Sequence, residues 1–117
     1  MKKMIFISRH EPTVEQVEMA RGRGFDLVHV GDADAFNVAA VRRLVEVNFP
    51  GVVPAVALVN PAMALNVASL ATESGIYIGT FENEQRSEVG GKPTFHAKSL
   101  HVWQVFGDAS YGVFPVV

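Results

Sequence analysis

Residues 4–13 read MIFISRHEPT, and this stretch decides how the rest of the chain is interpreted. Four apolar residues lead directly into Ser8, Arg9 and His10, and Pro12 follows as a proline that can open a helix. The pattern predicts a first β-strand. Its carboxyl end would deliver the three polar side chains to the crevice where open α/β sheets bind ligands.

Two later positions give strong helix signals. Thr13 and Gln16 form a capping box for a helix that ends at Gly22 or Gly24. Asn60 is an N-cap followed by proline at the first helical position, which is the clearest helix start in the chain. The predicted strands span 25–30, 52–59, 76–81 and 94–106, and the other predicted helices span 35–47, capped by Asp34, and 62–74.

This order of elements predicts an α/β fold. We expect a Rossmann-like three-layer sandwich whose mostly parallel sheet is closed by an antiparallel strand or hairpin. Residues 82–91 are polar and end in glycine, so they are expected to form an exposed loop. Residues 111–117 are too apolar for a free tail and should pack on the same chain or on a partner copy. Residues 1–117 then form one domain.

Composition narrows the class of function. The chain has 117 residues, 49% of them apolar, which is enough for one core. A formal charge of −2 gives no bulk attraction to duplex DNA or to an acidic membrane surface, so anion recognition must be local. Without cysteine there is no disulfide and no thiolate nucleophile, which agrees with a cytoplasmic protein. No apolar run approaches the length of a membrane span.

The first candidate site joins two strand-to-helix junctions, 8–13 and 60–62. Each offers free backbone amides and the positive end of a helix dipole, which together suit an anion. Arg9 adds bidentate donors, Ser8 and Thr13 add hydroxyl groups, and His10 adds an imidazole that can exchange a proton. Asn60, Pro61 and Ala62 supply the second helix start. Two alternatives stay open: the first junction is only a solvated loop, and Asn60 is only a cap.

A second candidate cluster lies later in the chain and consists of Arg86, Lys92, His96, Lys98 and His101. His96 and Lys98 would share one face of a strand, with His101 on the other face. The cluster would form a lid or wall over an anion, with Lys92, His96 and Lys98 as ligand-binding residues, or it is a solvated edge that deters strand pairing. Trp103 is interpreted as a core residue, with stacking on a base as the alternative.

The sequence lacks the motifs of several classes of functional site. The glycine patterns of dinucleotide and P-loop sites are absent, and no nucleophile elbow supports a Ser-His-Asp triad. The four histidines lack tight metal-ligand spacing, and His29 is interpreted as a hydrogen-bonded core histidine. Asp32 and Asp34 are better explained by turn and capping roles than by cation binding. We therefore expect neither a metal nor a cofactor.

The run Ile7-Ser8-Arg9-His10, followed by Glu11-Pro12-Thr13 and a helix, resembles the small stand-alone CRISPR-associated ring nucleases. One group of these enzymes carries a similar Ser-Arg-His run after its first strand. Another group has a Ser-His-Pro-like turn there with a glutamine soon after it, which Gln16 matches. The Asn60-Pro61 helix start and the stretch Lys92-Pro93-Thr94-Phe95 are similar in layout. The motif itself covers only the first dozen residues.

The resemblance implies a CARF-like homodimer that binds a cyclic oligoadenylate, cyclic tetra-adenylate in particular, across its two-fold axis. It further implies metal-independent cleavage, in which a ribose 2′-hydroxyl attacks the adjacent phosphorus and leaves a 2′,3′-cyclic phosphate. Arg9, His10 and Ser8 would be the catalytic residues. Such an enzyme switches off type III CRISPR signalling in antiviral defence. Glu11 departs from this scheme because it places a negative charge beside the phosphate site, and Glu82 has no assigned role.

Two other classes of function stay open. The chain could be a non-catalytic sensor or sponge for a cyclic nucleotide, which would return its ligand intact. It could also be an α/β interaction subunit whose apolar segment 111–117 docks a partner.

Overall fold

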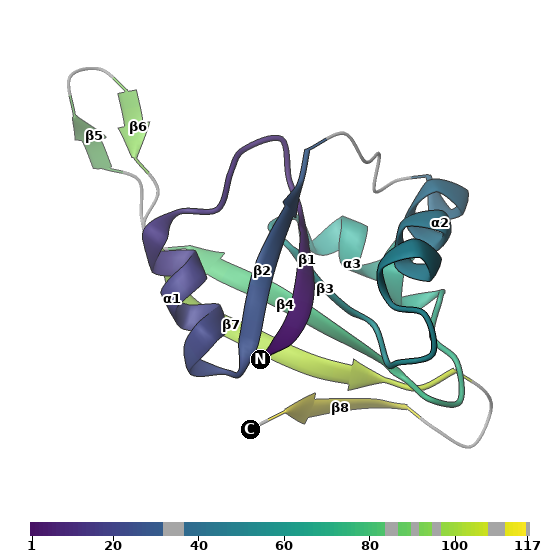
Figure 1. The fold of residues 1–117 in the computed structure, drawn as a ribbon. Helices are drawn as coiled ribbons and strands as arrows, with labels where there is room; N and C mark the ends of the chain where they lie inside the picture. Colours follow the sequence, from purple (N-terminus) through teal and green to yellow (C-terminus); the bar gives the residue numbers. More distant parts are fainter. Residues whose placement is uncertain (32–36, 84–86, 90–91, 95–96, 108–111, 117) are drawn as a thin grey trace.

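The computed structural model describes residues 1–31, 37–83, 87–89, 92–94, 97–107 and 112–116, with only the backbone at 61, 83, 87–89 and 92–94. Six strands form one sheet in the order β2-β1-β3-β4-β7-β8 (Figure 1). Their bounds are β1 Lys2–Ile7, β2 Phe25–Val30, β3 Ala55–Leu58, β4 Ile76–Asn83, β7 Ala97–Val105 and β8 Val113–Val116. The first four strands are parallel and the last two antiparallel, which confirms the predicted mixed sheet.

The sheet lies between two helical layers. Helix α1 (Val14–Gly22) covers one face, while α2 (Val38–Asn48) and α3 (Pro61–Ala68) cover the other (Figure 1). Strand alternation makes this possible, because Phe6 packs in the cluster that contains Ala20 of α1, and Ile7 packs in the cluster that contains Val67 of α3. We call these the α1 face and the α3 face of the sheet. The predicted Rossmann-like sandwich is confirmed.

The helix starts follow their caps. Thr13 and Gln16 make the predicted capping box, and Asn60 caps α3 with proline at its first position. Helix α2 begins later than predicted, because the side chain of Asn37 accepts a hydrogen bond from the Ala40 amide at 3.2 Å. The prediction of Asp34 as its cap is therefore wrong, and Asp34 itself lies outside the described residues.

Helix α3 ends at Ala68, six residues before the predicted end at position 74. Two i→i−3 bonds tighten the chain there, from the amide of Leu70 to the carbonyl of Val67 and from the amide of Ala71 to that of Ala68. Strand β3 is also shorter than predicted, because it begins only after Pro54, which has no amide hydrogen to donate.

The prediction of an exposed loop at 82–91 is wrong in part. Strand β4 continues to Asn83, and β5 (Ser87–Val89) pairs antiparallel with β6 (Lys92–Thr94) in a separate two-stranded sheet. Only two residues, both glycine in the sequence, separate the paired Val89 and Lys92, which is a favoured hairpin spacing. This hairpin stands clear of the main sheet in Figure 1.

The apolar carboxyl-terminal segment packs on the same chain, one of the two predicted outcomes. Strand β8 pairs with β7 from Val102 to Val105. At the Val102 end of this pairing, the Arg23 guanidinium donates to the carbonyls of Leu100 and Val116. Arg23 follows the end of α1. The first helix and the last strand are thus joined directly.

None of the helices in the described part of the chain has both the length and the apolar character that crossing a membrane requires.

Candidate functional site

The parallel strands bring the two predicted helix starts to one edge of the sheet. Strand β1 pairs with β2 on one side and with β3 on the other, so the strand order reverses at β1. Ile7 lies opposite Leu58, and both strands end there. The segments 8–13 and 60–62 therefore leave the sheet side by side at a topological switch point, where open α/β sheets bind ligands.

A pocket of about 340 Å³ opens at this edge, on the α1 face. Three of the predicted site residues, Ser8, His10 and Thr13, line it together with Glu11. The remaining lining residues are Phe6, Gln16, Val59 and Ala97. The volume is at the small end of the range for small-molecule sites. Glu11 adds a carboxylate that opposes an anionic ligand.

Two hydrogen bonds hold the loop that carries these residues. The amide of His10 donates to the Ser8 hydroxyl at 3.2 Å, and His29 Nε2 lies 2.8 Å from the Ser8 carbonyl oxygen. A carbonyl can only accept, so His29 Nε2 carries the hydrogen. The interpretation of His29 as a hydrogen-bonded histidine is confirmed, although it is half-buried rather than part of the core.

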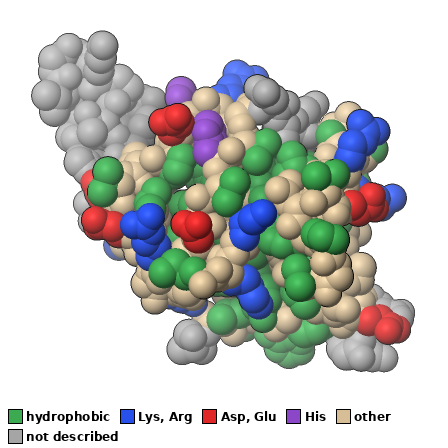
Figure 2. Space-filling model, in the orientation of Figure 1, with side chains coloured by type: hydrophobic (Ala, Val, Ile, Leu, Met, Phe, Trp, Pro, Cys, Tyr) green, Lys and Arg blue, Asp and Glu red, His purple; other side chains and the backbone are tan. Residues whose placement is uncertain are grey.

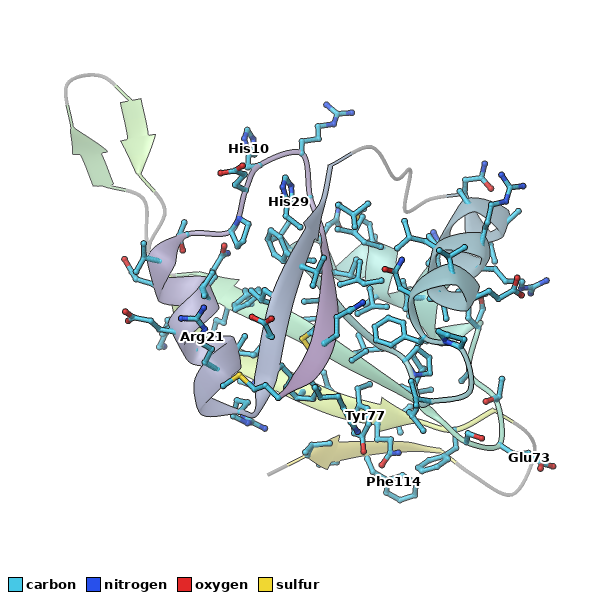
Figure 3. The ribbon with its side chains drawn as sticks, in the orientation of Figure 1. His10, Arg21, His29, Glu73, Tyr77 and Phe114 are labelled. Carbon is cyan, nitrogen blue, oxygen red and sulfur yellow. The ribbon has the colours of Figure 1, made fainter. Side chains whose placement is uncertain are left out.

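His10 lies at the outer end of the loop, above His29 (Figure 3). The same orientation in Figure 2 shows histidine side chains at the molecular surface in this region. His10 is exposed, and its ring has no hydrogen-bond partner in the described part of the chain. An exposed imidazole at a pocket mouth can take part in proton transfer with a bound ligand.

Thr13 combines capping with a free donor. Its hydroxyl oxygen accepts from the Gln16 amide at 3.2 Å, and Gln16 Oε1 accepts from the Thr13 amide at 2.9 Å. The hydroxyl hydrogen is not used in the capping box, so Thr13 can still donate to a ligand oxygen in the pocket.

The second helix start does not contribute in the predicted way. Asn60 Oδ1 accepts from the Ala62 amide at 2.9 Å, and the Asn60 carbonyl accepts from the Met63 amide. The Ala62 amide is therefore occupied by the cap and not left for an anion. Neither Asn60 nor Ala62 lines the pocket, and for Pro61 only the backbone is described. The interpretation of Asn60 as only a cap fits best.

Arg9 is exposed on the loop between Ser8 and His10 and is not part of the pocket lining. Its guanidinium has no ion pair or hydrogen bond within the ranges that the structure describes. Lys92 lies in the β5–β6 hairpin, with only its backbone described, and both Arg86 and His96 lie outside the described residues.

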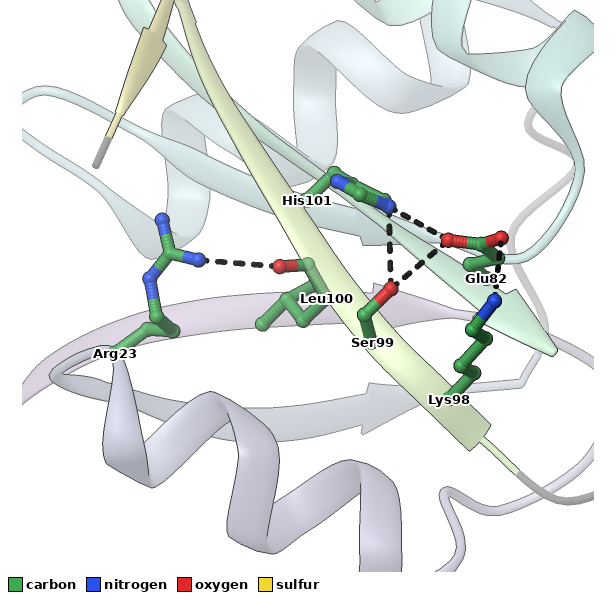
Figure 4. Close-up of polar contacts among 6 residues, drawn as sticks. All are labelled: Arg23, Glu82, Lys98, Ser99, Leu100 and His101. Atoms are coloured by element: carbon green, nitrogen blue, oxygen red, sulfur yellow. Dashed lines mark hydrogen bonds and ion pairs between the residues drawn. The ribbon is translucent and has the colours of Figure 1, made fainter. Parts of the chain in front are cut away.

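The second predicted cluster is organised around Glu82, to which the sequence analysis assigned no role. Glu82, near the end of β4, is opposite Ser99 on β7 (Figure 4). Its Oε2 lies 3.0 Å from His101 Nε2 and accepts from the Ser99 hydroxyl at 3.0 Å, and its Oε1 lies 3.7 Å from Lys98 Nζ. Lys98 and His101 thus meet at one carboxylate. The contact with Glu82 depends on the register of the antiparallel strands β4 and β7, which the sequence alone did not indicate.

The Glu82 cluster is exposed and polar. The hydrogen bond with His101 lowers the pKa of Glu82, and the Ser99 hydrogen bond and the positive charge of Lys98 lower it further. The carboxylate and the Ser99 hydroxyl both approach the same nitrogen of His101. A nucleophilic triad needs them on opposite ring nitrogens, so this arrangement does not activate Ser99.

Trp103 is half-buried and belongs to neither core cluster, so its interpretation as a core residue is wrong. Its ring instead lies 5.8 Å from the His101 ring, at an interplanar angle of 30°.

A larger cavity of about 620 Å³ lies at the opposite end of the sheet, beside the segments that enter β3 and β4. Its charged lining residues are Arg42 and Glu46 of α2. None of the predicted site residues lines it, and ligands of open α/β sheets bind at the carboxyl ends of the strands. The smaller pocket is therefore the better candidate.

Comparison with known proteins finds no matching family model, no matching curated protein and no matching solved structure.

Proposed function

We propose that this protein is a ring nuclease that binds a cyclic oligoadenylate, cyclic tetra-adenylate in particular, and cuts it to linear products. One observation carries the proposal: Ser8, His10 and Thr13 line a single pocket at the switch point between β1 and β3. Hydroxyl donors and an imidazole around one cavity suit a phosphodiester, whose charge they can stabilise and whose protons they can move.

In the proposed reaction, a ribose 2′-hydroxyl attacks the adjacent phosphorus. His10 takes the hydroxyl proton while the new O2′–P bond forms and the P–O5′ bond breaks. The proton then passes to the departing 5′-oxygen, which leaves a 2′,3′-cyclic phosphate. Ser8 and Thr13 hold the phosphate oxygens, and Arg9 reaches over the rim to stabilise the charge on the transferring group. Such a reaction depends on alignment and charge stabilisation and proceeds without a metal.

A cavity of about 340 Å³ is too small for four nucleotides. We therefore propose a homodimer in which two pockets related by a two-fold axis share one ring. The reaction would take place in the cytoplasm and would switch off type III CRISPR signalling during antiviral defence.

The test is incubation of the purified protein with a panel of cyclic oligoadenylates in EDTA, followed by chromatography. We expect linear products with 2′,3′-cyclic phosphate ends, and a rate about 100-fold lower for His10→Ala and Arg9→Ala. Arg21→Ala is the matched control, since Arg21 is exposed on α1 and does not line the pocket.

Other outcomes would replace the proposal. A ring that raises the melting temperature but is recovered intact would indicate a sensor or sponge. No shift with any ring, together with loss of a complex when 111–117 are deleted, would indicate an interaction subunit. Val113 and Phe114 of that segment are exposed on β8.

A further inference from the structure

The α3 face of the sheet carries an aromatic surface beyond the helix that packs on it. Helix α3 contacts β3 and β4. On the next strand, His101 and Trp103 share strand alternation with Val105, which belongs to the core cluster on the α3 face. The His101 side chain is 50% exposed and Trp103 is half-buried, so both residues are partly accessible to solvent.

Hydrogen bonds fix the orientation of the His101 ring. The Glu82 carboxylate can only accept, and the single hydroxyl hydrogen of Ser99 is donated to Glu82 Oε2. His101 Nε2 must then carry a hydrogen, which points between the carboxylate and the hydroxyl at 3.0 and 3.1 Å. One edge of the ring is therefore anchored and its plane is held beside Trp103. A preorganised ring loses little entropy when a flat ligand stacks on it.

The charges around these rings suit a nucleotide. Lys98 Nζ lies beside Glu82 Oε1 and can pair with a phosphate group. Glu82 itself can accept a hydrogen bond from an exocyclic amine of a base. Aromatic faces that stack on bases, flanked by polar groups that read the base edge, are the usual elements of a nucleotide-binding surface.

We propose that Glu82, Lys98, His101 and Trp103 form a second site, which binds an adenine nucleotide by stacking its base on the two rings. The choice of adenine rests on the proposed function, while the stacking itself does not. This surface lies three strands from the end of β1, about 14 Å across the sheet. The pairing shows this, because His101 is opposite Thr80, Thr80 is opposite Leu58, and Leu58 is opposite Ile7. The surface is separate from the pocket, which opens on the α1 face.

Trp103 is the only tryptophan of the chain, so its fluorescence reports on this site alone. We expect adenosine 5′-monophosphate to quench the fluorescence in a saturable way and ribose 5-phosphate, which has no base, to leave it unchanged. His101→Ala should raise the dissociation constant about 10-fold, since one stacked base is worth about that factor. His101→Phe keeps an aromatic face and should retain the quenching if His101→Ala merely unfolds.

The ligand could be a free mononucleotide or a base within an oligoadenylate, and the titration separates the two. Quenching at lower concentration by cyclic tetra-adenylate than by the monophosphate identifies the oligonucleotide, and the reverse order identifies the mononucleotide. Equal quenching by ribose 5-phosphate, no quenching at all, or unchanged affinity in a folded His101→Ala variant would overturn the inference.

Failure of the second site can be told from failure of the proposed function. His10→Ala should lower the rate of ring cleavage about 100-fold but leave the quenching intact, because His10 lies at the pocket on the other face. A protein that cuts no ring but shows His101-dependent quenching would refute the nuclease and keep the second site.

Discussion

Single hydrogen atoms decide which groups at the sheet edge are available to a ligand. The amide of Ala62 is used by the Asn60 cap, whereas the Thr13 hydroxyl keeps its hydrogen although its oxygen caps α1. From the sequence, both junctions were predicted to offer free amides to an anion, because a cap and an anion use the same amides. Ser8 and His10 could be predicted, since residues that follow a first parallel strand reach the ligand edge whatever the loop geometry.

Glu82 and Ser99 could not be predicted as partners. They lie 17 positions apart, and their contact depends on the register of β4 against β7, which shifts at the end of the pair between Glu82 and Asn83. No local pattern fixes such a register.

The lowered pKa of Glu82 gives a test with a defined sign. Its carboxyl group should titrate below its usual value of 4.5, mainly because of the hydrogen bond with His101. The charged form therefore stabilises the folded state fully above that value, and the stabilisation is lost as the pH falls through the lowered pKa. Carbon-detected NMR titration of the side chain measures the midpoint. His101→Ala should raise it towards 4.5, and an unchanged midpoint would contradict the assigned contact.

Arg23 compensates for the short pairing between the last two strands. Strand β8 covers β7 only from Val102 onward, which leaves the Leu100 carbonyl at an unpaired strand edge. The guanidinium donates to this carbonyl at 3.2 Å and also to the carbonyl of Val116. The capping box and the β2 and α3 starts were predictable because each depends on neighbouring residues. This bridge was not, since it joins a helix end to a distant strand.

Loss of this bridge should weaken the fold measurably. Arg23→Ala is expected to lower the free energy of unfolding by about 1.5–3 kcal/mol, because hydrogen bonds from a charged donor are lost and a carbonyl is left unpaired. Urea denaturation monitored by circular dichroism gives the value. Arg21→Ala, two residues earlier on the exposed side of α1, should change it by less than about 0.5 kcal/mol. Equal effects of the two substitutions would show that the bridge contributes nothing.

At the scale of the whole molecule, the backbone after β7 packs closely against the segment that follows α3. Gly107 follows β7, and its amide donates to the Thr72 carbonyl at 3.0 Å, in the segment after α3. A Cβ at Gly107 would lie 2.2 Å from the carbonyl oxygen of Ala71, a backbone atom that cannot move aside alone. The overall sandwich could be predicted from the alternation of strand and helix patterns. This contact could not, because a glycine after a strand reads only as a turn.

Gly107→Ala should therefore separate β7 and β8 from the segment behind α3 and lower the free energy of unfolding by about 3 kcal/mol. Gly112→Ala is the matched control, since a Cβ there meets nothing within 4 Å and Gly112 is not among the positive-φ glycines. It should leave the thermal midpoint almost unchanged. A midpoint for Gly107→Ala equal to that of the native protein would refute the close approach.

The bridge from Arg23 also bears on the order in which the molecule assembles. Its two acceptors lie 77 and 93 positions further along the chain of 117 residues, so making it closes a long loop. Closing such a loop is costly in entropy, and chains dominated by distant pairings fold slowly. Helix α1 and its neighbour β2 are close in sequence and can meet early, whereas the Arg23 bridge can form only after β7 and β8 have reached the sheet.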